Sequence, residues 1–583
     1  MTANLLNSRY EILPSPVGTE RDRCQAMART LQVPETIGLL LWQRGIRTVE
    51  AAWNHLYPRL SDLPDPFLLP GVDEAVDLIL DTVSARGRIV VYGDYDVDGI
   101  CATVLLVRFL AELGAQAMHV IPDRITEGYG INCKKLHEIS RGATGPTLLV
   151  TVDCGISDVD EVALAKQLGF RVIITDHHQP GDRLPEADVL VNPALVRTMF
   201  SEPLLSGAGV AFVLLMGLRS RLVSRGTWSR ETAPNLKQYL DLVALGTVAD
   251  VMPLGGVNRV LVRAGLEVLS TRNRPGIKVL CSLSGLEEGI VQAEDISYRL
   301  APRINAAGRV GNLAPAVDLL LTANWDEANR LGRELEQANE TRKELEQVAL
   351  EQAREQAEEQ VNRGRRGLVL WNASWHAGII GILAARIVDA FGLPALVGTV
   401  EHNGNTYRFS GRSIKHINLY DMLTRCGEHC LSFGGHAMAA GLVVDGSQLA
   451  DFSKAFARQA GILVQEPTRE CSVERVDCQV TVNEILDQSF ARSLEMLGPF
   501  GEANREPVFL LPRQRLQDIR VTGDHLVFRL ATRKGSVRGI GFRMASCRDL
   551  VTEAVDLTFN LRRSMYRGCS RIEVQATGIY PSV

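Results

Sequence analysis

A short apolar run that ends in three closely spaced carboxylates constrains this chain more than any other feature. Residues 89–92 are Ile, Val, Val and Tyr, and Asp94, Asp96 and Asp98 follow them. A β-branched apolar run that ends at a glycine predicts a buried strand, and the apolar residues 100–113 predict a helix after it. The acids therefore lie at the C-terminal end of a strand, the edge at which open α/β sheets bind ligands. Carboxylates crowded at one edge repel one another, which favours a bound divalent cation.

Three further apolar segments deliver acids or imidazoles in the same way. We expect all of them to end at the edge where the first three acids lie. A lone aspartate after a strand is more often a helix cap, and a lone histidine pair can be a loop feature, but four such segments together indicate a metal site. The segments and the residues that follow them are 147–152 with Asp153, 171–175 with Asp176, His177 and His178, and 240–248 with Asp250.

The motifs around these residues resemble those of a known superfamily. GDYDVDG, TVDCG, TDHH and LGTVAD occur in the order of the four motifs of the DHH phosphoesterases. Further motifs extend the resemblance from about residue 35 to the C-terminus. They are similar to motifs of the RecJ family, bacterial exonucleases specific for single-stranded DNA. These further motifs are IPDRITEGYG, GAGVAF, APRINAAGR, SWHAGIIGILAARI, SGRSI and FGGHAMAAG.

Changes of pattern along the chain, taken with the resemblance, predict five regions. Residues 1–75 predict a helical segment that packs on the catalytic domain, and residues 76–323 predict a doubly wound parallel sheet, the DHH domain. Residues 324–363 contain no proline and carry apolar residues at helical spacing, which predicts one long connecting helix, with coiled-coil dimerisation as the alternative. Residues 364–466 predict a second α/β domain, DHHA1. Residues 467–583 predict the short strands of an all-β OB-fold domain.

Charge is distributed unevenly along the chain. The net charge is −5, but residues 501–583 hold fourteen Lys or Arg against eight Asp or Glu, a local balance of +6. A basic module on an acidic chain predicts a face that contacts the phosphate backbone of nucleic acid, with a solvated basic surface as the alternative. The candidate base-stacking residues in this region are Phe528, Phe542, Phe559 and Tyr566, although alternation along strands predicts that most of them lie in the core.

Segments for membrane insertion or secretion are not predicted. The sequence has no uninterrupted apolar stretch of about 18 residues, and its N-terminus has no basic region before a long apolar core. Eleven cysteines are scattered without a disulfide framework, which predicts reduced thiols in a cytoplasmic protein. Cys426, His429, Cys430 and His436 lie close in sequence, but C-x3-C spacing without a second pair argues against zinc.

The resemblance implies a pair of divalent cations at the acidic edge. Mixed carboxylate and imidazole ligands favour Mn²⁺ over Mg²⁺, which prefers shells made only of oxygen. Two such ions about 4 Å apart activate water and stabilise the leaving oxygen of a phosphodiester. By the resemblance, Asp153 bridges the two ions. The implied metal ligands are Asp94, Asp96, Asp153, His177 and Asp250.

The resemblance also implies catalytic and substrate-binding residues. His178 would contact the scissile phosphate, Asp176 would orient the imidazoles, and Arg303 would offset charge in the transition state. Glycines beside serine, arginine and histidine suit a close-fitting phosphate pocket, although each histidine could instead be structural. Arg124, Ser410 and Arg412 would hold the 5′-phosphate. The other implied substrate-binding residues are Asn305, His376, Gly434, Gly435 and His436.

The function implied by the resemblance is 5′→3′ degradation of single-stranded DNA to 5′-mononucleotides in DNA repair and recombination. We expect a monomer whose partners are single-stranded DNA with a 5′ end, a single-strand-binding protein and a RecQ-type helicase, with no membrane involved. Three alternatives stay open: a DHH phosphoesterase acting on pyrophosphate, cyclic dinucleotides or short oligonucleotides, a catalytically silent DNA-binding scaffold, and a structural metal protein. The basic β region argues against the first, the complete set of acids and histidines against the second, and the phosphate-type loops against the third.

Overall fold

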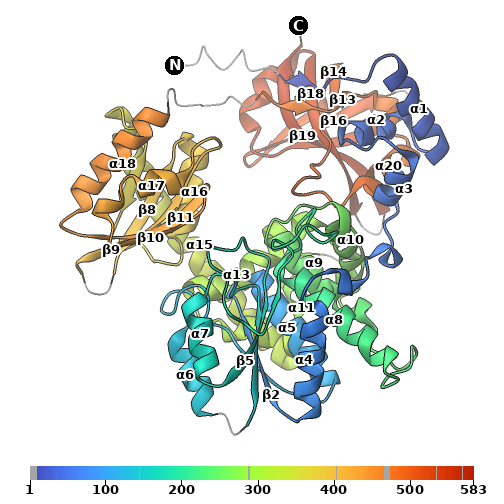
Figure 1. Ribbon diagram of the computed structural model, residues 1–583. Coiled ribbons are helices and arrows are strands. Elements are labelled where there is room, and N and C mark those ends of the chain that lie inside the picture. The colour runs from blue at the N-terminus through green and yellow to red at the C-terminus, as the bar shows by residue number, and fades with distance from the viewer. Residues whose placement is uncertain are drawn as a thin grey trace.

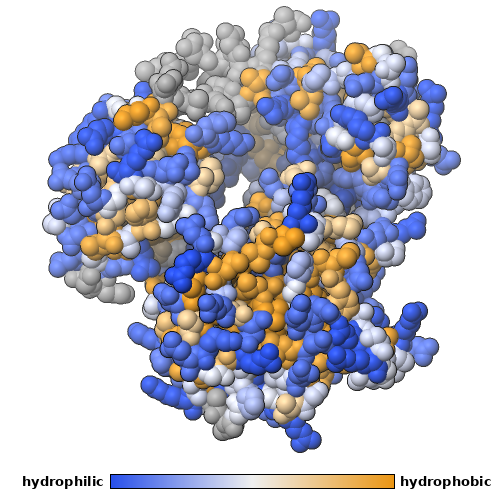
Figure 2. Space-filling view, in the orientation of Figure 1, coloured by the Kyte–Doolittle hydropathy of each residue, from blue (hydrophilic) through white to orange (hydrophobic). Residues whose placement is uncertain are grey.

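The chain folds into three lobes that surround a central opening (Figures 1 and 2). The predicted boundary between residues 466 and 467 and the side chain of Tyr566 lie outside the described residues. The computed structural model describes residues 10–142, 145–286, 289–401, 404–464, 473–532, 535–566 and 569–582.

A five-stranded parallel sheet lies at the centre of the catalytic lobe. Its strand order is β3-β2-β4-β5-β6, and every neighbouring pair is parallel. The chain leaves β2 toward one edge and then returns to β4 on its other side, so the direction of winding reverses between β2 and β4. Ligands of open α/β sheets bind at such a reversal. The strands are β2 (Arg88–Gly93), β3 (Gln116–Val120), β4 (Thr147–Val152), β5 (Phe170–Thr175) and β6 (Val189–Val191).

Helices cover both faces of this sheet, as the doubly wound prediction requires (Figure 1). α4 (Val72–Ser84), α5 (Val97–Glu112) and α8 (Gly207–Ser224) share one hydrophobic core with alternate strand residues. α6 (Cys133–Arg141) and α7 (Val159–Gln167) share a second core with the intervening strand residues. Because both faces are buried, the strands appear in the sequence as continuous apolar runs.

Helix α8 is the one helix in the described part of the chain whose length and composition would allow it to cross a membrane. Within the protein, 67% of its apolar window is buried. A core helix of this kind passes the same test of length and composition.

The strand–helix alternation ends at β6, earlier than predicted. Residues 240–248, which we grouped with the strand-like segments, form α9. A run of fully buried residues does not by itself distinguish a strand from a buried helix, and here the helix packs between neighbouring helices. The rest of the catalytic lobe is helical. Its main helices are α9 (Leu240–Ala249), α10 (Gly256–Thr271), α11 (Pro275–Leu283), α13 (Ala301–Val310) and α14 (Ala314–Leu321).

One long helix joins the catalytic lobe to the second lobe, as predicted. α15 (Trp325–Asn362) has 38 residues and is therefore about 57 Å long. Leu331 and Leu335 join the core of the catalytic lobe, whereas Ala353 and Ala357 join the core of the second lobe. The connecting helix thus belongs to both lobes and fixes the distance between them.

The second lobe contains a mixed sheet of order β10-β11-β9-β8-β7, covered by helices. Only the β7–β8 pair is parallel. Its elements are β7 (Leu368–Trp371), β8 (Ala395–Val400), β9 (Thr406–Arg412), β10 (Ser432–Gly435), β11 (Ala439–Asp445), α16 (Ile380–Phe391), α17 (Leu419–Thr424) and α18 (Leu449–Leu463).

The C-terminal lobe is built on a seven-stranded sheet of order β13-β14-β18-β19-β17-β16-β15. Phe528 and Phe559 are fully buried in its core, so they do not serve as stacking surfaces, whereas Phe542 is 48% exposed. The strands are β13 (Cys478–Gln479), β14 (Phe509–Gln514), β15 (Gln517–Thr522), β16 (His525–Thr532), β17 (Gly535–Gly541), β18 (Val555–Tyr566) and β19 (Cys569–Pro581).

The N-terminal helices pack on the C-terminal lobe, so our placement of residues 1–75 on the catalytic domain holds only for residues 60–75 (Figure 1). Their apolar faces complete the core of the C-terminal sheet, and they contact α20 (Gln488–Leu497). The N-terminal segment also pairs directly with the start of the C-terminal lobe, since β1 (Glu11–Ile12) runs parallel to β12 (Arg475–Val476). The apolar faces of three short helices predict burial, but they do not identify the partner. The helices are α1 (Thr19–Leu31), α2 (Glu35–Gln43) and α3 (Val49–Leu56).

Candidate metal centre and active site

The first acidic motif is held by the start of α5. The Oδ1 atom of Asp96 caps this helix by accepting hydrogen bonds from Asp98 N at 2.9 Å and Gly99 N at 3.1 Å. Asp98 is buried and accepts from Gly207 N at 2.5 Å and Ala208 N at 3.0 Å, which ties α5 to the N-terminus of α8. The positive end of that helix stabilises the carboxylate. Two strand–helix junctions are thus locked together by the acids themselves.

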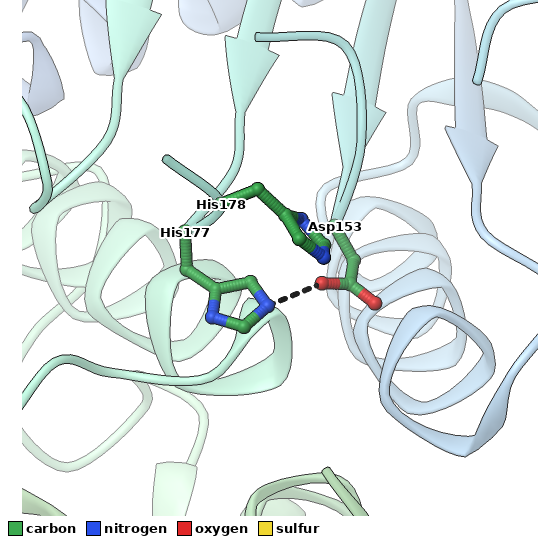
Figure 3. A group of neighbouring side chains, drawn as sticks. All are labelled: Asp153, His177 and His178. Atoms are coloured by element: carbon green, nitrogen blue, oxygen red, sulfur yellow. Dashed lines mark ion pairs between the residues drawn. The ribbon is translucent and has the colours of Figure 1, made fainter. Parts of the chain in front are cut away.

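The second motif holds its acid in a strained backbone conformation. Asp153 directly follows β4 and has φ 63°, the left-handed region that residues other than glycine rarely adopt. Its Oδ1 atom lies 3.0 Å from His177 Nε2 (Figure 3). The same nitrogen lies 3.6 Å from Asp250 Oδ2. Strain of this kind is retained where the surrounding structure requires one side-chain position, and active sites are common examples.

Three overlapping groups of side chains could each hold a metal ion. Within each group the ligand atoms lie within 4.8 Å of one another. Asp153 belongs to two of the groups and His177 also belongs to two, so the groups form one continuous cluster suited to two ions with a shared ligand. The groups are Asp94 with Asp96 and Asp153, Asp153 with His177 and His178, and Asp98 with His177 and Asp250.

Unsatisfied buried atoms in this cluster fit a divalent cation. Asp94 Oδ1 and His177 Nδ1 are buried and have no hydrogen-bond partner among the described residues, and Asp153 Oδ1 and His177 Nε2, although 3.0 Å apart, do not form a well-oriented hydrogen bond. Buried polar atoms without partners are costly, and a metal ion would satisfy these. Burial, followed by the charge of neighbouring acids, raises the pKa of Asp94 and Asp153 well above the ordinary value and that of Asp250 to about 8. A cation would remove this repulsion.

His178 is held by Asp176 and faces the cluster. Its Nδ1 atom lies 2.7 Å from Asp176 Oδ1, and Asp176 also accepts from the backbone nitrogens of Ile156, His177 and His178. Burial alone lowers the pKa of His178, but the hydrogen bond and charge of Asp176 raise that pKa to about 9. A protonated imidazole at this position suits an anionic substrate. The Tyr129 hydroxyl lies 3.2 Å from His178 Nδ1, a contact that the sequence did not predict.

Two glycines allow neighbouring helices to approach the acids. A Cβ atom at Gly207 would lie 2.4 Å from Asp153 Oδ1, and one at Gly246 would lie 2.3 Å from Asp98 Oδ1. Neither distance is compatible with an alanine in the present geometry. The motifs GAGVAF and LGTVAD contain these residues, but only the fold shows which glycine faces which acid.

The structure does not bring Arg303 to the cluster, which contradicts the placement implied by the resemblance. Its Nε atom pairs with Glu336 of α15 at 2.5 Å, and its other nitrogens donate to Glu336, Arg299 O and Leu283 O. Arg309 lies six residues further along α13, on another face of the helix, and is close enough to Asp96 for their charges to interact. The sequence of the motif APRINAAGR does not show which of its two arginines lies near the acidic cluster.

Three guanidinium groups converge beside the acidic cluster. Arg124 lies over the ring of Tyr95 at 4.9 Å, and Arg412 donates to Ser410 Oγ at 3.4 Å. Burial and then the charge of Arg124 lower the pKa of Arg412, and burial with Arg124 also lowers that of Arg309, to about 10. Positive groups that depress one another's pKa are suited to bind an anion between them.

The remaining expected substrate residues come from the loops of the second lobe and from α13. The Nδ1 atom of His376 accepts from Gly378 N at 3.1 Å, and Gly378 packs so closely on Arg309 that a Cβ atom would lie 1.9 Å from Arg309 O. Asn305 and Arg309 line one cavity. The other three, Gly434, Gly435 and His436, are exposed at the end of β10.

The cysteine and histidine group considered for zinc is not among the candidate metal sites found in the described part of the chain. Cys426 is buried, and Cys430 Sγ donates to Cys426 O at 3.8 Å. His429 contacts Gln448 through Nδ1 at 3.2 Å. These contacts are those of ordinary structural residues.

Comparison with known proteins relates this geometry to one family. Models of the DHH family N-terminal domain, the DHHA1 domain and the RecJ OB domain match residues 88–247, 364–462 and 476–577. The chain is 37% identical over 532 residues to the single-stranded-DNA-specific exonuclease RecJ of Salmonella typhimurium, covering 88% of this chain and 91% of that protein. The chain belongs to the RecJ family.

Other members of the RecJ family share its fold and differ in length. The chain is 35% identical to RecJ of Bacillus subtilis over 90% of its own length, but it spans only 65% of that relative. The crystal structure of Thermus thermophilus RecJ in complex with Mn²⁺ matches with a TM-score of 0.81 and 32% identity over 98% of this chain and 79% of that one. The complex with Mg²⁺ matches with a TM-score of 0.74. The α/β, α/β and OB-fold organisation is therefore confirmed.

Proposed function

We propose that this chain is a metal-dependent exonuclease that removes 5′-mononucleotides from the 5′ end of single-stranded DNA during repair and recombination. The observation that supports this most strongly is the buried cluster of carboxylates and imidazoles beside three guanidinium groups, in a chain of the RecJ family. The guanidinium groups would hold the 5′-phosphate while the carboxylate and imidazole cluster hydrolyses the adjoining phosphodiester bond.

The acidic cluster would hold two divalent ions, Mn²⁺ or Mg²⁺. Bound there, the ions supply Lewis acidity and a nucleophile from water at neutral pH. Asp153, which belongs to two of the three candidate groups, is the ligand that would be shared. The proposed ligands are Asp94, Asp96, Asp153, His177 and Asp250.

Residues around the ions would position the phosphodiester. Asp176 orients His178 and raises its pKa, which favours an imidazolium that can donate to a phosphate oxygen. Arg309 replaces Arg303 as the arginine that we propose offsets charge in the transition state, because it lies near Asp96. Arg124 and Arg412, with Ser410, would bind the terminal 5′-phosphate.

The two arginines of α13 can be distinguished by substitution. We expect Arg309→Ala to lower kcat by about 10²-fold, because it removes a cation beside the reacting phosphate. Arg303→Ala should mainly lower the melting temperature, because it leaves Glu336 without its partner. Steady-state hydrolysis and thermal unfolding of both variants provide the measurement. A larger loss of kcat in Arg303→Ala would restore the role that the sequence resemblance implied.

We propose in addition an oligomeric state, a cellular location and partners for the protein. The expected units, at residues 76–323, 324–363, 364–466 and 467–583, would act as one monomer in the cytoplasm, with single-stranded DNA crossing the opening between the lobes. A single-strand-binding protein and a RecQ-type helicase would present that strand. Residues 24–56 complete the core of the C-terminal lobe, so a truncation that tests the OB-fold domain must remove both segments together.

The test uses single-stranded oligonucleotides labelled at the 3′ end, with or without a 5′-phosphate. We expect a ladder of shortening labelled fragments that requires Mn²⁺ or Mg²⁺, is abolished by EDTA and is absent on blunt duplex. Immediate release of a labelled mononucleotide would reverse the polarity. DNA binding without cleavage would favour the silent scaffold.

A further inference from the structure

A large groove separates the catalytic lobe from the C-terminal lobe. Its volume is about 1160 Å³, which exceeds the roughly 300–1,000 Å³ typical of small-molecule pockets. Asn305 and Arg309 lie in its wall, so the groove reaches the active-site face of α13. Figure 2 shows apolar surface on the catalytic lobe below the central opening. The size and position of the groove suit a polymer that enters the active site.

Three large apolar side chains in the wall of this groove are unusually exposed. Ile290 is 78% exposed, Tyr298 is 77% exposed and Val251 is 65% exposed. Single exposed apolar residues are ordinary, but several along one concave surface indicate a binding site. Tyr298 is the aromatic residue among them and therefore offers a flat face to a ligand.

Irregular backbone conformations position two of these side chains. Val251 directly follows the proposed ligand Asp250 and has φ 57°, a genuine outlier for a β-branched residue. Tyr298 lies on the π-helix Ile296–Leu300, which leads directly into α13. π-helical turns inside helices occur frequently at functional sites. Two irregular backbone segments that adjoin the proposed active site thus project apolar groups into one groove.

The two arginines that β18 contributes to the opposite wall are already paired. Arg562 of β18 pairs with Glu294 and donates to Glu506 at 2.8 Å, and Arg563 contacts Glu495 at 3.3 Å. Because acids neutralise these arginines, this part of the groove has little net charge to attract a phosphate chain. Its recognition chemistry is that of the apolar and aromatic surfaces, which suits nucleobases.

We infer that Tyr298 and Val251 form a contact surface for nucleobases of the DNA strand, with Tyr298 stacking on a base close to the scissile phosphate. This inference rests on the proposed function and adds residues that bind substrate through its bases. Every base has a π-face, so the contact is independent of sequence. It would hold the strand in place between successive cleavages.

The inference is tested by combining a substitution in the enzyme with an abasic site in the substrate. Single-stranded substrates carrying one abasic nucleotide at successive positions from the 5′ end are compared with intact DNA, using wild-type protein and Tyr298→Ala. On intact DNA we expect Tyr298→Ala to raise KM about 5- to 150-fold, the range for loss of one stacking contact, with kcat little changed. When the abasic nucleotide lies at one particular position, KM of wild-type protein should rise by the same factor. On that substrate Tyr298→Ala should raise KM no further.

Matched variants separate stacking from structural damage. Tyr298→Phe keeps the aromatic ring and should restore the wild-type KM, and Tyr420→Ala changes an exposed tyrosine of the second lobe and should leave KM unchanged. The inference is overturned if the losses from Tyr298→Ala and from abasic DNA multiply at every position, or if Tyr298→Phe behaves like Tyr298→Ala. An inactive wild-type protein would instead contradict the proposed function.

Discussion

Asp153→Asn is expected to reduce hydrolysis of single-stranded DNA by about 10³-fold or more while the protein remains folded. Asp153 belongs to two of the three candidate metal groups, so the amide would weaken both proposed ion sites at once. The substitution preserves the shape of the side chain, although it removes the charge that faces His177 Nε2 at 3.0 Å. Single-turnover cleavage of a labelled oligonucleotide in saturating Mn²⁺ measures the effect.

Thermal unfolding gives a second readout that does not depend on activity. In EDTA the variant should melt at a higher temperature than wild type, because burial and neighbouring acids raise the pKa of Asp153 and its charge destabilises the metal-free fold. Added Mn²⁺ should raise the melting temperature of wild type more than that of the variant. Asp160→Asn, at an exposed position on α7, is the control and should match wild type in both experiments. Undiminished cleavage by Asp153→Asn would refute the metal assignment.

Gly207→Ala is expected to lower kcat by about 10²-fold although it adds a single methyl group. The new Cβ atom would lie 2.4 Å from Asp153 Oδ1 and 2.5 Å from Asp153 Cβ, so either the carboxylate or the start of α8 must move. Displacement of a reacting group by about 1 Å can cost this much in rate. The helix itself should tolerate alanine, which is a better helix former than glycine.

Gly209→Ala is the matched control, since this glycine lies on the same helix. Its Cβ atom would approach Leu205 at 3.3 Å and would not reach the acids, so hydrolysis should stay within a few-fold of wild type. Circular dichroism and thermal unfolding confirm that both variants fold. Equal kcat values for the two variants would show that the packing of α8 does not set the position of Asp153.

The core of the site could be predicted from the sequence because it depends on local pattern and on topology. Buried parallel strands appear as continuous apolar runs, and residues that follow such strands must meet at one edge of the sheet. These two rules are sufficient to bring Asp94, Asp153 and His177 together. The long helix at residues 325–362 was equally clear from its spacing and from the absence of proline.

Other features could not be predicted because they depend on contacts between distant segments. The apolar run at residues 240–248 is compatible with a strand, and only its packing among helices makes it α9. Arg303 and Arg309 share one motif, but the position of α15 decides which of them is paired with Glu336. The partner of the N-terminal helices is more than 400 residues away in the chain.

The most direct test of the account is a crystal structure of the protein grown with Mn²⁺, with diffraction recorded at the manganese absorption edge. We predict two anomalous peaks that share Asp153, one bounded by Asp94 and Asp96 and the other by His177 and Asp250. A single peak, or peaks that do not contact Asp153, would contradict the assignment of this cluster as a two-metal catalytic centre.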